Sequence, residues 1–324
     1  MIMTMVQAIN RALAGELERD DRVVVFGEDV GRDGGVFRVT EGLFERFGPD
    51  RVMDTPLAES GAVGAAIGMA ALGLRPVPEI QFMGFIYPAF NQIVSHLARI
   101  RNRTRGRFTA PITIRTPYGA GVKALEHHSE STEALFCHLP GLTVVVPSNP
   151  YDAKGLLAAS IRSDDPVIFL EPTRLYRAEK QEVPEEPYEV PLRQAAVVRE
   201  GRDLTIVAWG AMIPVAREAA AAAEAQNFSV EIVDLRTLSP MDRATILSSV
   251  RKTGRAIVLH EAPKTCGLGA EIAATIAESA LLSLKAPVAR VTAPDITVPL
   301  SKREDLYYPN ADRVLRAVRA LMEY

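Results

Sequence analysis

The sequence predicts an α/β protein of two domains, each built on a mostly parallel sheet that helices cover on both faces. Short aliphatic and β-branched runs alternate with helical patterns along the whole chain, which is typical of parallel sheets. The 324 residues, 48% of them hydrophobic, exceed what one core usually organises. A stretch rich in Pro and Glu, residues 176–195, separates two alternating halves and reads as an exposed linker.

The first half, residues 1–175, alternates predicted helices with predicted strands. The helices show apolar positions at helical spacing, and the strands are short apolar runs bounded by polar loops. We predict helices near residues 4–18, 60–72, 88–103 and 151–163, and strands at 23–26, 75–82, 111–116, 142–148 and 165–172.

The second half, residues 196–324, repeats the alternation without a visible sequence period, so we predict a doubly wound domain rather than an internal repeat. The last helix is amphipathic. We predict strands at 204–210, 229–235, 255–261 and 288–295, and helices near 211–226, 240–251, 268–282 and 312–324.

Charge and composition exclude several classes of function. The formal net charge of −3 gives no reason to expect nucleic acid or anionic lipid as a partner. No apolar run reaches the roughly 18 residues of a membrane span, and the N-terminus lacks the features of a signal peptide, so we expect a cytoplasmic protein. Cys137 and Cys266 are too few and too far apart for a disulfide framework or a zinc site.

Two acidic groups lie at the ends of predicted elements, one of them directly after a strand, where open α/β sheets bind ligands. Glu28 comes directly after the strand at 23–26 and precedes a Gly-rich turn that lacks dinucleotide-binding spacing, so on its own it reads as a solvated acid. Glu59 stands at the start of a helix with several glycines, each costing about 1 kcal/mol relative to Ala, which indicates close approach of another backbone or subunit. The helix dipole alone could favour an acid at position 59.

Two further segments carry aromatic, amide and imidazole groups. Gln81 and Phe85 lie near the end of the strand at 75–82, where aromatic residues at this spacing more often belong to a core than to a ligand platform. The adjacent His127 and His128 point in different directions, which disfavours chelation of one metal by both. A loop histidine used for acid/base catalysis is the alternative.

Taken together, these segments resemble the beta subunits of the thiamine-diphosphate-dependent dehydrogenase component of bacterial 2-oxo acid dehydrogenase complexes, closest to the pyruvate type. The resemblance covers the full length, and its motifs occur in family order. They are GEDVG (27–31), MDTPLAESG (53–61), PEIQF (78–82), HHS (127–129), PYDAKGLL (150–157), DPVIFLEP (165–172) and VDLRTLSP (233–240).

The resemblance implies a fold and a set of residue roles. Residues 1–175 would form a pyrimidine-binding-type sandwich, followed after the linker by a transketolase C-terminal-like domain at 196–324. Glu59 would share a proton with a ring nitrogen of the aminopyrimidine and favour the imino tautomer that deprotonates the thiazolium. Phe85 would stack on the same ring, with Glu28 and Gln81 in the polar wall of the pocket. His128 would assist decarboxylation or acyl transfer to a lipoyl group, and His127 has no catalytic role.

The resemblance also implies a structural potassium ion, which as a hard cation prefers oxygen ligands. Ser163 stands where the family often has Asp, although its backbone carbonyl could serve unchanged. The matching positions are Ile112, Ser160, Ile161, Ser163 and Asp165.

The diphosphate half of a thiamine site is missing from the sequence. We find no Gly-Asp-Gly motif followed by Asn-Asn, although the diphosphate charge needs a metal or fixed donors. The resemblance therefore implies an alpha subunit that holds magnesium and the diphosphate, and a heterotetramer containing a second beta subunit. The lipoyl domain of an acyltransferase component would accept the acyl group formed from the 2-oxo acid.

Three alternatives stay open at this point. A branched-chain 2-oxo acid dehydrogenase beta subunit would preserve every catalytic residue named, although GFIYPAF (84–90) and ARIRNRT (98–104) favour the pyruvate type. A structural scaffold subunit would share the fold without the chemistry. A non-catalytic nucleotide-binding or electron-transfer protein has no support from a P-loop or an intact dinucleotide fingerprint.

Overall fold

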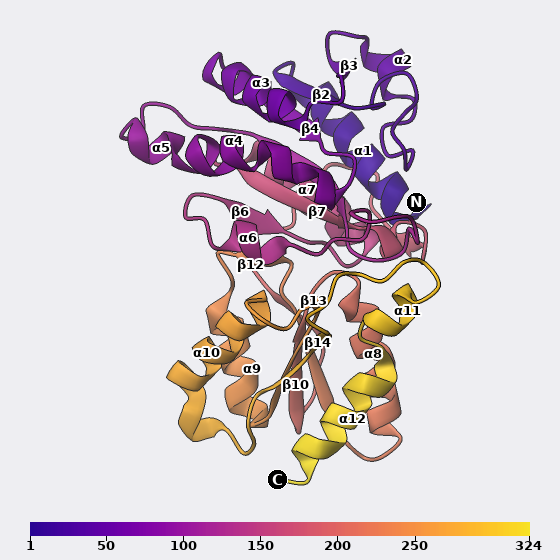
Figure 1. Ribbon diagram of the computed structural model, residues 1–324, viewed down its shortest axis with the longest axis vertical. Helices are drawn as coiled ribbons and strands as arrows, with labels where there is room; N and C mark the ends of the chain where they lie inside the picture. The colour runs from indigo at the N-terminus through magenta and orange to yellow at the C-terminus, as the bar shows by residue number, and fades with distance from the viewer.

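The computed structural model describes residues 1–324 and places one large sheet in each half of the chain, as Figure 1 shows. The first sheet has seven strands in the order β12-β6-β7-β5-β4-β2-β3, and the second has five in the order β14-β13-β10-β11-β9. All neighbours in both sheets pair in parallel except β12 and β9. The predicted α/β class with mostly parallel sheets is therefore confirmed.

The first half follows the predicted alternation closely. Helix α1 begins with a capping box between Thr4 and Gln7, and α7 begins after the side-chain cap Asn149, so local sequence fixes both starts. The strands are β2 Val23–Gly27, β3 Val52–Asp54, β4 Arg75–Glu79, β5 Thr113–Tyr118, β6 Thr143–Val145 and β7 Val167–Pro172, and the short β1 Ile2–Met3 pairs with β8 Gln181–Glu182. The helices are α1 Met5–Arg19, α2 Leu43–Phe47, α3 Glu59–Ala71, α4 Phe90–Ser95, α5 Ile100–Arg103, α6 Glu133–Cys137 and α7 Pro150–Arg162.

The second half contains the predicted doubly wound sheet. Asp242 and Asn310 cap the helices α9 and α12 through their side chains. The strands are β9 Ala196–Arg199, β10 Leu204–Ala208, β11 Val230–Asp234, β12 Thr237–Ser239, β13 Ala256–Pro263 and β14 Ala289–Ala293, and the helices are α8 Met212–Glu224, α9 Arg243–Thr253, α10 Leu268–Ala280, α11 Glu304–Tyr307 and α12 Ala311–Met322.

One predicted element is wrong. Residues 88–103 do not form a single helix but a 3-10 segment at Met83–Ala89, helix α4, a second 3-10 turn at Leu97–Arg99 and helix α5. The backbone leaves the helical region at His96, with φ −120°. Side chains of Arg99 and Arg103 donate to the carbonyls of Val94 and Ser95, which replaces hydrogen bonds lost at the break.

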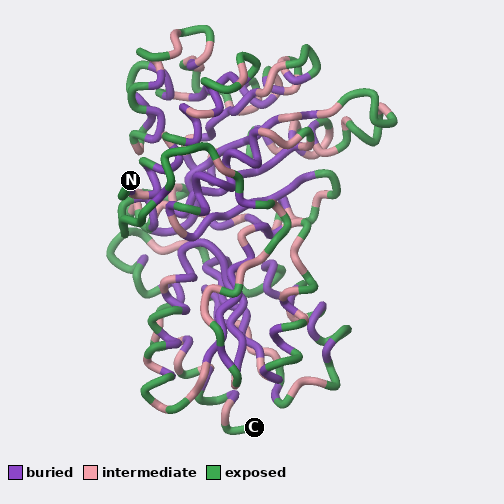
Figure 2. The backbone as a smooth tube through the Cα atoms, turned by 180° about the vertical axis from the view of Figure 1, so that it is seen from behind, coloured by how far each residue is buried: buried purple, intermediate pink, exposed green.

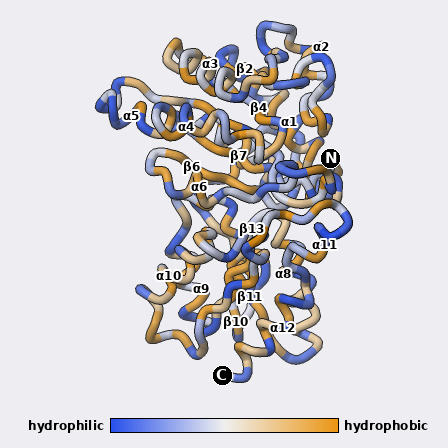
Figure 3. The backbone as a smooth tube through the Cα atoms, viewed as in Figure 1, coloured by the Kyte–Doolittle hydropathy of each residue, from blue (hydrophilic) through white to orange (hydrophobic).

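Two hydrophobic cores hold the halves together. Buried residues of α1 and α7 form one core with the first sheet, and this core extends to residues of α8 and α12 in the second half. Buried residues of α3 and α4 belong to the other core, which extends to residues of α9 and α10. Figure 2 shows the buried strands at the centre of each half, and in Figure 3 the hydrophobic colours follow the same strands. Strand β12 from the second half pairs with β6 at the edge of the first sheet. The halves are therefore joined by strand pairing as well as by the two hydrophobic cores. None of the helices combines the length and the apolar character needed to cross a bilayer.

A buried polar cluster lies where the halves meet. Tyr118, Glu133, Trp209 and His260 are fully buried, and the rings of Trp209 and His260 stack 5.3 Å apart. Burial, with a smaller contribution from the charge of Glu261, raises the pKa of Glu133 to about 8. Burial, with the nearby charge of Arg290, lowers the pKa of His260 to about 4. The junction therefore favours uncharged side chains.

Replacing Glu133 with Gln is expected to stabilise the protein at pH 8 and to change little at pH 5. An unfolded Glu ionises near pH 4.5, whereas folded Glu133 keeps its proton up to about pH 8, so the cost of ionising it grows as pH rises between these values. The expected gain at pH 8 is on the order of a few kcal/mol. Thermal unfolding at both pH values measures it, with the exposed Glu179→Gln as the control. An equal gain at both pH values would contradict this explanation.

Candidate active site

Three of the predicted site residues meet at the carboxyl edge of the first sheet. Glu28 directly follows β2, Gln81 lies just after the neighbouring strand β4, and Glu59 is the first residue of α3. All three line one narrow crevice together with Glu79, the last residue of β4. Parallel pairing explains the meeting, because Gly27 and Glu79 stand opposite each other at the ends of adjacent strands.

The crevice is acidic and partly shielded. Burial is the main cause that raises the pKa of Glu28, and the charges of Asp29 and Glu59 add to it. Gln81 donates from Nε2 to Asp29 Oδ2 at 3.2 Å. The lining carries three carboxyl groups and no cationic side chain. This arrangement fits a nitrogen base that shares or accepts a proton, and it does not fit a diphosphate.

His128 and Phe85 lie beside the crevice, outside its lining. The two rings meet edge to face with centroids 5.1 Å apart, and the His128 ring is 4.5 Å from that of Phe82, which follows Gln81 in the chain. His128 Nδ1 lies 3.0 Å from the carbonyl oxygen of Glu126, which can only accept a hydrogen bond, so Nδ1 carries the proton. In the neutral ring Nε2 is then free to accept a proton.

His127 lies apart from this group. Its backbone is left-handed, with φ +70°, and its exposed side chain has Nδ1 3.8 Å from Glu130 Oε1. The adjacent imidazoles thus have separate surroundings.

A buried ion network beneath the crevice was not predicted from the sequence. Arg115 of β5 donates to Glu79 at 2.8 Å and to both carboxylate oxygens of Glu171 at 2.7 and 3.0 Å, and Tyr176 donates to Glu171 at 2.7 Å. The sequence does contain a pattern that could have predicted this network, because Glu79, Arg115 and Glu171 are charged residues within otherwise mostly uncharged strands. Opposite charges within buried strands that neighbour each other in the sheet indicate a paired network.

Comparison with known proteins places the chain in a family. The family described as "Transketolase, pyrimidine binding domain" matches residues 2–179, and "Transketolase, C-terminal domain" matches residues 193–314. The pyruvate dehydrogenase E1 component subunit beta of Acholeplasma laidlawii is 52% identical over 99% of this chain and 98% of that protein. The Bacillus subtilis (strain 168) protein of the same name is 53% identical over 99% of both. The chain belongs to the family of pyruvate dehydrogenase E1 component beta subunits.

The family predicted from the sequence is therefore confirmed, and it is one of thiamine-diphosphate-dependent enzymes of the transketolase type. A solved structure titled "Split gene transketolase, inactive beta4 tetramer" superposes with a TM-score of 0.81, covering 99% of this chain and 98% of that one. At 23% identity that likeness concerns the fold alone.

The five residues predicted to bind potassium lie close together but already have partners. Arg75 Nη1 donates to the carbonyls of Ile161 and Ser163 at 3.1 and 3.0 Å. A potassium ion on these oxygens would share them with a guanidinium, and the two positive charges would repel each other. Potassium binding here stays a prediction. Other contacts of these residues include Val167 N–H to the Ile112 carbonyl, Ser163 N–H to the Ser160 carbonyl, Ser163 Oγ to the Asp165 carbonyl, and Arg101 Nε to the Asp165 carboxylate.

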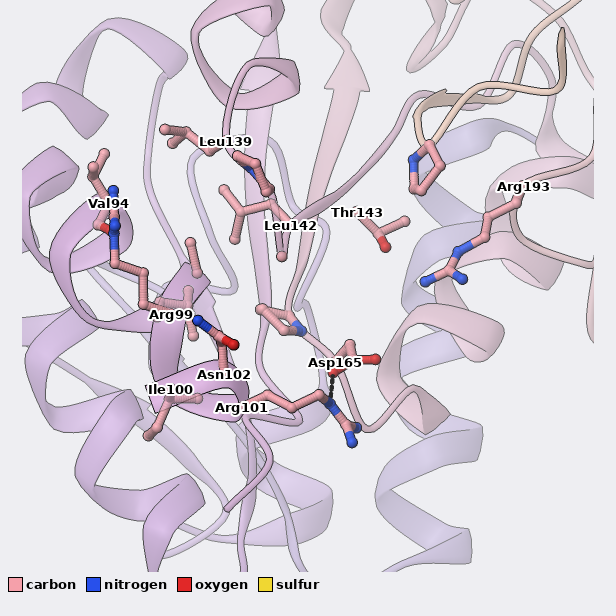
Figure 4. A pocket seen from close by; sticks show the side chains of 16 residues that line it. Val94, Arg99, Ile100, Arg101, Asn102, Leu139, Leu142, Thr143, Asp165 and Arg193 are labelled. Atoms are coloured by element: carbon pink, nitrogen blue, oxygen red, sulfur yellow. Dashed lines mark hydrogen bonds and ion pairs between the residues drawn. The ribbon is translucent and has the colours of Figure 1, made fainter. Parts of the chain in front are cut away.

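A separate cavity of about 430 Å³ lies away from the crevice, between α4–α5 and the segment 139–143 (Figure 4). Arg101 pairs with Asp165 at 2.5 Å in this cavity, and Arg193 of the linker and Pro240 of the second half also line it. Apart from Asp165, it contains none of the predicted site residues.

Proposed function

We propose that this chain is the beta half of a pyruvate dehydrogenase that works only with a separate alpha chain. The complete enzyme would decarboxylate pyruvate oxidatively and transfer the acetyl group to a lipoyl group of an acyltransferase component. The observation that carries the proposal is the crevice lined by Glu28, Glu59 and Gln81, with the Phe85 and His128 rings beside it. Relatives of that name at 52–53% identity support it.

Each residue has a task in this proposal. Thiamine diphosphate, when bound, supplies the nucleophilic carbon and the electron sink for decarboxylation. Glu59 holds a proton at a nitrogen of the aminopyrimidine ring, while Glu28 and Gln81 complete the polar wall. Phe85 stacks on the ring and excludes water. His128 accepts or returns a proton through Nε2, because its Nδ1 is committed to the Glu126 carbonyl.

The alpha chain would supply what the crevice lacks. No cationic side chain lines it and the sequence has no Gly-Asp-Gly motif followed by Asn-Asn, so magnesium and the donors that neutralise the diphosphate would come from the partner. Helix α3 offers a surface for such a partner, because a Cβ at Gly68 would meet no atom and Gly61 is exposed. We propose a heterotetramer of two alpha and two beta chains.

Two further parts of the proposal do not depend on the crevice. The acyltransferase would dock on the C-terminal half, where Tyr324 is exposed. The cytoplasm is the compartment expected from the sequence.

Co-purification with the alpha chain and titration with thiamine diphosphate and magnesium test the proposal. We expect binding by the mixture and none by the isolated chain. The complex should then use pyruvate in preference to 2-oxoisovalerate. Cofactor binding by this chain alone would refute the shared site, and a preference for the branched acid would move the substrate to the branched-chain class.

A further inference from the structure

The loop that carries His128 is held in place by the second half of the chain. This His128 loop, residues 119–132, connects β5 to α6. The N–H of Ala120 donates to Glu261 Oε2 at 3.2 Å, at the end of β13. The phenol of Tyr308, directly after α11, donates to the carbonyl of Ser129 at 2.9 Å. Both ends of the loop therefore contact segments far away in sequence.

Glu304, the first residue of α11, joins the two ends. Its Oε1 accepts the N–H of Gly121 at 3.0 Å, and its Oε2 accepts the hydroxyl of Ser129 at 3.3 Å. The side chain is 2% exposed and forms no ion pair, so its carboxyl group is committed to these two donors. Ser129 is the residue next to His128, so this contact lies one peptide from the imidazole.

Close packing leaves the loop little freedom. Gly119 has φ +76°, and a Cβ there would come within 2.7 Å of the Glu261 carboxylate. On the other side, a Cβ at Gly84 would lie 2.3 Å from the His127 carbonyl oxygen. The loop packs between the aromatic segment that carries Phe85 on one side and the second half of the chain on the other. Movement of either of these two segments would therefore move the His128 ring.

We propose that Glu304 is a positioning residue for His128. By accepting hydrogen bonds from both Gly121 and Ser129, Glu304 fixes the position of the imidazole against the edges or faces of the Phe82 and Phe85 rings. The second half of the chain would then contribute to acyl transfer by holding this loop in place. The inference rests on the proposed role of His128 and deepens it. Glu304 touches neither cofactor nor substrate in this account, and it acts only through the loop.

The test uses the complete enzyme with its alpha chain, thiamine diphosphate, magnesium and a lipoyl domain. Glu304→Ala removes both acceptors and is expected to lower kcat for lipoyl acetylation by about 10–100-fold. Glu304→Gln should retain most activity, since its oxygen can accept from Gly121 and its amide can donate to the Ser129 hydroxyl. Asp305→Ala is the matched control, because the Asp305–Lys123 pair is exposed and such pairs contribute little. Tyr308→Phe provides a milder variant should Glu304→Ala fail to fold.

A double-mutant cycle separates positioning from general damage. If Glu304 acts through His128, Glu304→Ala should have no further effect in a His128→Ala background, whereas a structural defect would lower both backgrounds equally. Cofactor affinity should not change. Equal losses in the two backgrounds, or wild-type turnover in both Glu304→Ala and Tyr308→Phe, would overturn the proposal.

Hydrogen exchange of the loop amides distinguishes this inference from the proposed function. Glu304→Ala should speed exchange at Gly121, and Asp305→Ala should not. Full activity in His128→Ala would refute the role of His128 whatever the exchange shows. Unchanged exchange at Gly121 would refute the positioning contact even with His128 essential.

Discussion

Glu59→Gln is expected to remove most turnover of the complete enzyme while leaving its assembly intact. Gln has nearly the same shape but cannot share a proton with a ring nitrogen, which is the task proposed for this carboxyl group. Loss of one positioned acid/base group commonly lowers rates by roughly 10²–10⁴-fold, and we expect a loss in that range. Steady-state reduction of a lipoyl acceptor with pyruvate measures it.

The control for this variant is Glu28→Gln, which changes the same crevice. Glu28 lines the crevice beside Glu59 but belongs to the polar wall in the proposed arrangement, so about a 10-fold loss or less is expected, well below the acid/base range. Both variants should co-purify with the alpha chain. Full activity in Glu59→Gln would favour a scaffold subunit. Equal losses in the two variants would mean that the crevice needs its charge rather than one particular carboxyl group.

Much of the fold followed from local patterns. The start of α1 was predictable because Thr4 and Gln7 form a capping box, and β2 because Val23–Gly27 is an unbroken buried run. The meeting of Glu28 and Gln81 followed from strand polarity, because both lie after neighbouring parallel strands. Their roles required the family resemblance, since neither residue carries a catalytic signature of its own.

The structural features that sequence patterns did not predict depend on contacts between residues far apart in the chain or on side chains that reach back to the backbone. The break at His96 is stabilised by Arg99 and Arg103 reaching back to freed carbonyls, which helical periodicity does not encode. Strand β12 joins the first sheet across a gap of about ninety residues, pairing Thr237 with Val145. The anchoring of the His128 loop likewise depends on a carboxyl group at position 304, in a helix of one turn without periodic pattern.

Arg115→Met is expected to destabilise the protein more than any surface change. Arg115 is fully buried between Glu79 and Glu171, and its removal leaves two buried carboxylates without a cation. Removing one partner of a buried ion pair typically costs about 3–5 kcal/mol. We expect the Tm to fall by roughly 5–15 °C at pH 7.5. Arg243→Met, at the exposed Arg243–Glu271 pair, should leave the Tm nearly unchanged.

The pH dependence of Arg115→Met distinguishes lost charge from lost packing. Burial already raises the pKa of Glu171 with Arg115 present, because desolvation is the largest influence on it, and loss of the guanidinium should raise that pKa further. An acid whose folded pKa lies above its unfolded value destabilises the fold as pH rises between the two. The stability deficit of Arg115→Met should therefore shrink as pH falls toward 5, and adding Glu79→Gln and Glu171→Gln should recover much of it at pH 7.5. The stability deficit could instead be the same at pH 5 and pH 7.5 and not be relieved by the two Gln substitutions. That result would mean that Arg115 stabilises the region beneath the crevice through packing of its side chain.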